Sequence, residues 1–91
     1  MFIIDANTMA AFGVSNFQPL EVVVSEYHPT LYFIRCLDKI VIMEFIDKKF
    51  FWVNTVVDPA IRMGSDRWRF VVTRSHLVLA FPPKYVAEYS L

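Results

Sequence analysis

The chain has 91 residues, of which 56% are apolar and 20% charged, and nine basic residues balance nine acidic ones to a formal net charge of zero. This length allows a single domain, residues 1–91, and the composition excludes an intrinsically disordered chain, which needs low hydrophobicity and high net charge. One cysteine excludes a disulfide framework and a Cys-based zinc site. The neutral charge removes the simplest argument for a nucleic-acid or membrane-surface protein.

The predicted elements begin with a short strand over Phe2–Ile4 and a short helix over Thr8–Phe12, which Asn7 would cap. Short β-rich runs with turn residues between them then follow: Leu20–Tyr27, Leu31–Leu37, Ile40–Ile46, Phe50–Val57, Trp68–Thr73 and Leu77–Phe81. Pro82-Pro83 opens a final stretch, Lys84–Ser90, that is predicted as one or two helical turns. The pattern predicts a mostly β fold: an antiparallel meander of five to six strands in a small barrel or sandwich, with short helical segments at the termini.

The predicted strands are apolar on both faces. In Leu31–Leu37, one face carries Leu31, Phe33 and Arg35, and the other carries Tyr32, Ile34 and Cys36. A sheet with one solvated face alternates between apolar and polar residues, so both faces of these strands must be covered. We expect the terminal segments to cover part of the second face and a partner chain to cover the rest. A domain this small cannot bury so much apolar surface by itself, which predicts an oligomer or a constitutive complex.

Two groups of residues are candidate contact sites. Phe50, Phe51 and Trp52 occupy successive positions of one strand, so that both faces receive a large ring. Either these rings fill two core faces of a sandwich or one set meets a partner. The second group lies in the basic part of the chain, since residues 1–58 carry a net charge of −3 and residues 59–91 a net charge of +3. It consists of Arg62, Arg67, Trp68, Arg69 and Arg74.

Arginines beside aromatic residues on a small β scaffold are typical of proteins that bind single-stranded nucleic acid. The competing interpretation places Arg67 and Arg69 on an outer strand face, where they pair with acidic residues of a neighbouring strand or of a partner. Because the whole chain is neutral, we favour protein contacts for this group.

The remaining motifs give weaker signals. Asp5 follows a short apolar strand in a strand-Asp-x-Asn pattern, and the start of PIN-type metal-dependent nucleases is similar. The rest of this chain is predicted as a β-meander too short for an α/β nuclease, so Asp5 is read as a turn or cap residue. Cys36 is predicted to be buried and unreactive. His28 and His76 fall at predicted turns, and Pro82-Pro83-Lys84-Tyr85 matches the PPxY motif that WW-type modules bind.

These observations predict a non-enzymatic protein-interaction or assembly protein that buries an apolar, aromatic-rich β surface against itself or another protein. Small domains of this kind are common among phage, viral and mobile-element proteins, as inhibitors of host machinery or as particle components. The alternative is a small barrel that binds single-stranded nucleic acid through the Arg62–Arg74 region. We expect no catalytic residues, metal, cofactor, membrane or small-molecule substrate. The single cysteine favours a reducing, cytoplasmic location.

Overall fold

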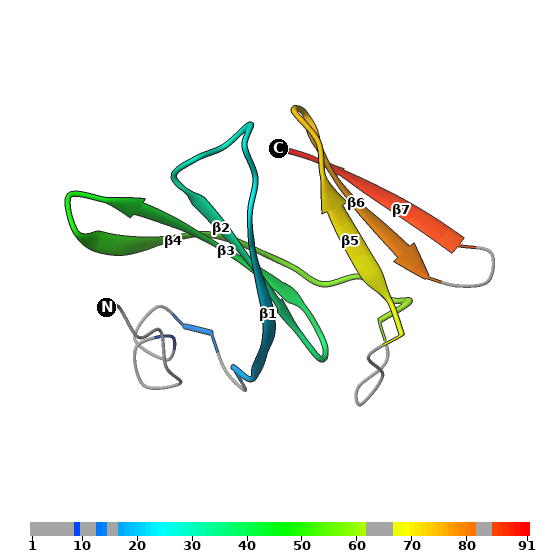
Figure 1. Ribbon diagram of the computed structural model, residues 1–91. Coiled ribbons are helices and arrows are strands. Elements are labelled where there is room, and N and C mark those ends of the chain that lie inside the picture. The colour runs from blue at the N-terminus through cyan, green and yellow to red at the C-terminus, as the bar shows by residue number, and fades with distance from the viewer. Residues whose placement is uncertain (1–8, 10–12, 15–16, 62–66, 82–84) are drawn as a thin grey trace.

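A computed structural model describes residues 9, 13–14, 17–61, 67–81 and 85–91. In these residues the chain forms seven strands in two antiparallel sheets, and spatial order follows sequence order in both (Figure 1). The four-stranded sheet has the order β1-β2-β3-β4 and the three-stranded sheet the order β5-β6-β7. The strands are β1 (Pro19–Val24), β2 (Leu31–Cys36), β3 (Ile40–Ile46), β4 (Lys49–Val56), β5 (Arg69–Val72), β6 (His76–Phe81) and β7 (Tyr85–Ser90).

The meander and the mostly β fold are confirmed, whereas the predicted strand count and the predicted C-terminal helix are wrong. The described residues form seven strands instead of five or six. Of the two predicted architectures, a barrel or a sandwich, these strands do not form a closed barrel, and they make two separate sheets. The expected C-terminal helix over Lys84–Ser90 is strand β7, which pairs with β6. The predicted strand Phe2–Ile4 and most of the predicted helix Thr8–Phe12 lie outside the described residues.

Strand β7 forms through its pairing with β6, which places every second residue against the core. Ala87 lies opposite Leu79 and Tyr89 lies opposite Leu77, and both pack against the buried core. Val86, Glu88 and Ser90 alternate with them and are exposed. Alternation of this kind matches a half-buried strand and does not match the 3.6-residue period of a helix.

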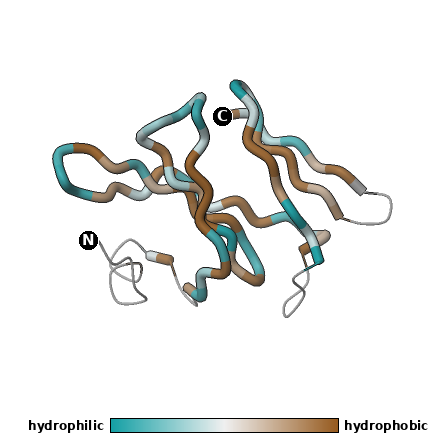
Figure 2. The backbone as a smooth tube through the Cα atoms, in the orientation of Figure 1, coloured by the Kyte–Doolittle hydropathy of each residue, from teal (hydrophilic) through white to brown (hydrophobic). Residues whose placement is uncertain are grey.

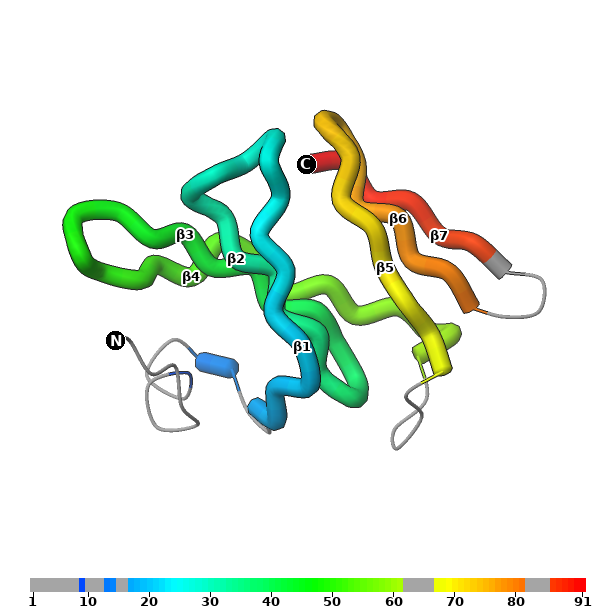
Figure 3. Tube along the Cα trace, in the orientation of Figure 1, coloured from blue at the N-terminus to red at the C-terminus, as the bar shows by residue number. Residues whose placement is uncertain are grey.

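The main core lies between the two sheets. It joins Phe33, Ile40, Ile42 and Val56 of the four-stranded sheet to Leu77 and Leu79 of β6 and to Trp68, which precedes β5. Residues 57–61 lead from the end of β4 toward the three-stranded sheet (Figure 3). Figure 2 shows the apolar character running along both sheets and polar residues at the hairpin turns.

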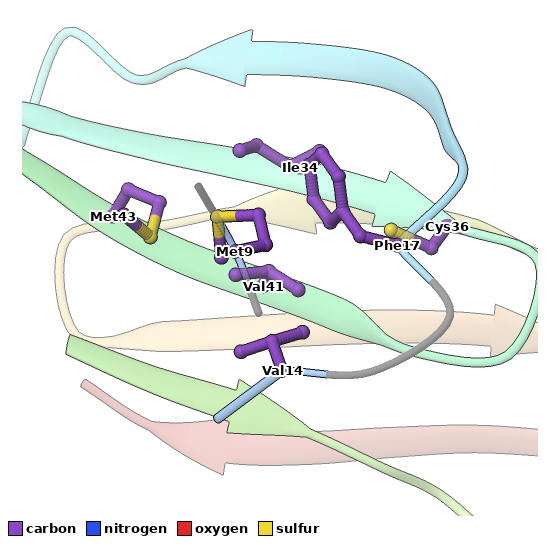
Figure 4. Close-up of a cluster of buried hydrophobic side chains, with 7 residues drawn as sticks. All are labelled: Met9, Val14, Phe17, Ile34, Cys36, Val41 and Met43. Carbon is purple, nitrogen blue, oxygen red and sulfur yellow. The ribbon is translucent and has the colours of Figure 1, made fainter. Parts of the chain in front are cut away.

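A second core covers the opposite face of the four-stranded sheet. Met9, Val14 and Phe17, which we call the N-terminal cover, pack against the centre of that face (Figure 4). The sheet residues beneath them are Ile34, Cys36, Val41 and Met43. Gly13, with a φ of 83°, adopts the left-handed conformation just before Val14, and Val14 N–H donates to the carbonyl oxygen of Met9 at 3.0 Å. The expectation that a terminal segment covers the second face is therefore confirmed for the N-terminal side.

The β3–β4 hairpin gives a prediction about stability. Ile46 pairs with Lys49, and the two residues between them, Asp47 and Lys48, have φ values of 52° and 64°. A two-residue turn with two positive φ values is of the type that prefers glycine, because a side chain raises the energy of the left-handed conformation. We expect Lys48→Gly to raise the free energy of unfolding by about 1 kcal/mol, measured by urea denaturation. Lys49→Gly, in the adjoining strand, should lower it, and the opposite order of the two variants would contradict the turn geometry.

Candidate interaction surface on strand β4

Strand β4 exposes three large apolar residues in succession. Phe51, Trp52 and Val53 are 48%, 43% and 46% exposed, and together they are called the β4 surface below. Val57, just beyond the strand, is 66% exposed. Single exposed apolar residues are normal in folded proteins, but three in succession along an edge strand leave an apolar edge open to a partner.

The pairing of β4 with β3 places the rings on opposite faces of the sheet. Trp52 lies opposite Met43, which is buried under the N-terminal cover, and Phe51 lies opposite Glu44, whose neighbours Ile42 and Ile40 alternate toward the core between the sheets. Directly opposed residues share a face, so the two rings flank the strand. The sequence prediction that both faces of this strand receive a large ring is confirmed.

Phe50 has a different role from the other two rings. It is half-buried and packs against the core under the N-terminal cover. Its ring centroid lies 4.7 Å from that of Phe45 and 5.3 Å from that of Tyr32, in tilted and edge-to-face arrangements that aromatic pairs prefer. Phe50 therefore anchors the start of β4, and the accessible part of the predicted aromatic site reduces to Phe51 and Trp52.

A β-bulge and two side-chain hydrogen bonds shape the middle of the strand. Ile42 pairs with Asn54 and Met43 with Trp52, so Val53 is the extra residue of the bulge. The indole Nε1–H of Trp52 donates to Thr55 Oγ1 at 2.9 Å, which fixes the ring along the strand. The backbone N–H of Thr55 donates to Asn54 Oδ1 at 2.8 Å.

A pocket of about 430 Å³ opens beside the same ring. Trp52, Thr55 and Val57 form one wall, and Gly13 and Val14 of the N-terminal segment form another. The Asp38–Lys39 ion pair, with 2.9 Å between Oδ1 and Nζ, adds a charged rim. The pocket has room for an apolar side chain of a partner next to the β4 surface.

The arginine-rich site predicted from sequence is not assembled as expected. Trp68 is 2% exposed and belongs to the core between the sheets, where its ring stacks on Phe81 with centroids 6.1 Å apart. The guanidinium of buried Arg35 lies over the same Trp68 ring, 5.4 Å from its centroid. The ring therefore offers no platform for a base or a partner side chain.

The exposed arginines lie around this core. Arg67 and Arg69 are exposed, and Arg69 Nη1 donates to the carbonyl oxygen of Trp68 at 2.9 Å. Arg74, in the β5–β6 turn, places its guanidinium 5.5 Å from the ring centroid of Tyr27. The fifth predicted residue, Arg62, lies outside the described residues. Arg69 and Arg74 are therefore engaged in contacts within the protein.

The two histidines that were predicted at turns both lie within hydrogen-bond distance of neighbouring polar groups. His28 Nε2 donates to the carbonyl oxygen of Arg74 at 3.0 Å, which connects the β1–β2 turn to the β5–β6 turn. His76, the first residue of β6, has its Nδ1 2.7 Å from Ser75 Oγ. Within the described parts of the chain, no group of three or more His, Cys, Asp and Glu residues is arranged to hold a metal ion. Asp5 and Pro82–Lys84 of the PPxY motif lie outside them.

Cys36 gives a second prediction. Its side chain is fully buried under the N-terminal cover, and burial raises the pKa of the thiol above its ordinary value, although nearby Lys39 lowers it in part. Because the thiolate is the reactive form, we expect iodoacetamide at pH 8 to modify Cys36 no faster than the protein unfolds. Reaction in 6 M guanidinium chloride provides the control. Mass spectrometry measures the modification. Rapid modification of the folded chain would show that the N-terminal cover opens.

Sequence reasoning missed Val53, Val57 and the pocket beside Trp52. The apolar run Phe50–Val53 could have indicated Val53. Its position in a bulge, however, depends on the pairing with β3, which the pattern along one strand does not reveal. Among the described residues, no helix has the length and apolar character needed to cross a membrane. No protein-family model, curated protein or solved structure matches the chain.

Proposed function

We propose that the chain is a non-enzymatic protein-interaction or assembly protein that acts by burying the β4 surface against itself or a protein partner. The observation that carries this proposal is the exposure of three successive large apolar residues, Phe51, Trp52 and Val53, on an edge strand. Edge strands of this kind recruit other strands, and exposed tryptophan is a frequent centre of binding energy. The pocket beside Trp52 supports the proposal, because it gives a partner side chain a place to anchor.

The exposed arginines add charged contacts outside the β4 surface, since Arg74 lies beside Tyr27 in the β1–β2 turn. Arg67 and Arg74 are exposed and can pair with acidic groups of a partner. The alternative function, binding of single-stranded nucleic acid, has less support. Its predicted aromatic residue, Trp68, lies in the core, so only the charges of these arginines remain to favour it. The buried free thiol of Cys36 fits a reducing, intracellular compartment.

The experiment compares proteins captured from the source cells by the wild-type chain and by two variants. Val53→Lys places a charge in the β4 surface, and Val86→Lys places the same charge at a 60% exposed position of edge strand β7. We expect partners, including further copies of the chain, to be retained by wild type and Val86→Lys and lost from Val53→Lys. Capture of nucleic acid that falls steeply with salt and does not depend on Val53 would replace this proposal with the nucleic-acid alternative.

A further inference from the structure

Strand β4 differs from the other edge strands of the two sheets in its charge. Residues 50–56 carry no charged side chain and no proline. By contrast, β1 begins at Pro19 and contains Glu21, β5 has only four residues and begins with Arg69, and β7 contains Glu88. Charges, prolines and short length are the usual devices that prevent edge strands from pairing with other chains. Strand β4 keeps two of these devices, Lys49 at its start and the bulge at Val53, and its residues 50–56 are otherwise suited to accept a further strand.

We infer that the strand added to β4 is the β4 of a second copy of the chain, in antiparallel orientation, so that two four-stranded sheets join into one continuous sheet. This inference rests on the proposed function and identifies its partner. An antiparallel pair related by a twofold axis brings the same residues of both copies together, which requires an interface that is complementary to itself. An uncharged apolar strand meets this requirement, since both copies supply apolar side chains and backbone hydrogen-bond groups to the same interface.

The charges around β4 select this orientation. Lys49, at the start of the strand, is its only charged residue. Antiparallel pairing places the two Lys49 residues at opposite ends of the pair, about 24 Å apart for seven residues of strand, which is more than twice the screening length of about 8 Å at physiological salt. Parallel pairing would bring the two ammonium groups side by side, which is destabilising. The zero net charge of the chain adds no long-range repulsion between copies.

The side chains of the β4 surface gain cover on both faces of the joined sheet. Phe51 lies on one face and Trp52 on the other, so pairing shields part of each ring. About half of each ring is exposed in the monomer, which corresponds to roughly 200 Å² per copy for the two aromatic side chains.

The test measures the association of the full chain by sedimentation equilibrium from 1 to 200 μM. We expect a monomer–dimer equilibrium for wild type and a dissociation constant raised at least tenfold by Val53→Lys, because like charges then meet near the twofold axis. Val86→Lys, on the β7 edge, should associate like wild type. Mixing Val53→Lys with Val53→Glu should restore a dimer, which neither variant forms by itself, whereas a loss of folding common to both variants would be seen in their circular dichroism.

Other outcomes overturn the inference. A wild-type chain that is monomeric at every concentration, or an association that Val86→Lys weakens as much as Val53→Lys does, would exclude a β4 dimer. If wild type is monomeric but its capture of other proteins is lost in Val53→Lys, the proposed function stands and the second copy is not the partner. If neither association nor capture depends on Val53, both proposals fail.

Discussion

Replacing Phe33 with alanine is expected to lower the free energy of unfolding by about 3–5 kcal/mol, and replacing its neighbour Ile34 by about 2–5 kcal/mol. The two residues are adjacent in β2 and point to opposite faces, and both are buried. Phe33 belongs to the core between the sheets, and Ile34 to the core under the N-terminal cover. Similar losses at both positions would show that the four-stranded sheet is covered on both sides.

Val22→Ala is the matched control. Val22 lies directly opposite Ile34 on the same face but is 53% exposed, because it is at the β1 edge. We expect Val22→Ala to lower the free energy of unfolding by about 0.5 kcal/mol. The two core variants should in addition lower the melting temperature by about 10 °C or more. Urea and thermal unfolding followed by circular dichroism give these values. If Ile34→Ala costs no more than Val22→Ala, the N-terminal cover does not pack on the sheet in solution.

Asp58→Ala is expected to lower the free energy of unfolding by about 2–4 kcal/mol. Asp58 is buried in the connection between the sheets, where Oδ1 accepts a hydrogen bond from Ala60 N–H at 2.8 Å and Oδ2 accepts one from the Tyr89 hydroxyl. The first bond closes the turn that leaves β4, and the second connects this turn to β7. The alanine variant loses both acceptors, so the turn and the last strand are both weakened.

A double-mutant cycle with Tyr89→Phe separates these two contributions. Tyr89→Phe removes the contact to β7 and keeps the turn, so a loss of about 1–2 kcal/mol is expected. Because the two substitutions remove the same contact, the double variant should be more stable than the sum of the single effects predicts, by about 1 kcal/mol. Additive effects would mean that the carboxylate acts through the turn and not through β7.

The sequence was sufficient to predict six of the strands, since their turn residues and short apolar runs are local signals. Ile40–Ile46 coincides with β3, and the other five predicted strands overlap their observed bounds to within a few residues. Strand β7 was missed because Pro82-Pro83 also suits the start of a helix and because the inward positions, Ala87 and Tyr89, carry only a weak apolar alternation. Its pairing with β6, a tertiary contact, decides the conformation.

The candidate site was predictable to the extent that it depends on one strand. The apolar run Phe50–Trp52 indicated rings on both faces of β4, but only the pairing with β3 and the aromatic cluster around Phe45 show that Phe50 is anchored and Phe51 is exposed. Trp68 was wrongly predicted to be accessible, because its sequence neighbours differ from its neighbours in space. Its arginine neighbours in sequence suggest an exposed segment, while the ring packs against residues far away in the chain, such as Phe81 and Arg35.

The strictly sequential order of the strands has a consequence for how the protein folds. Every ladder among the described strands joins two strands that follow one another in the chain. Each hairpin can therefore close over a short loop, with a small entropic cost, before the sheets meet. Two-state β-sandwiches with many non-local pairings fold in milliseconds to seconds, and proteins rich in local contacts fold faster. We expect this chain to fold near the fast end of that range, with docking of the two sheets as the late step.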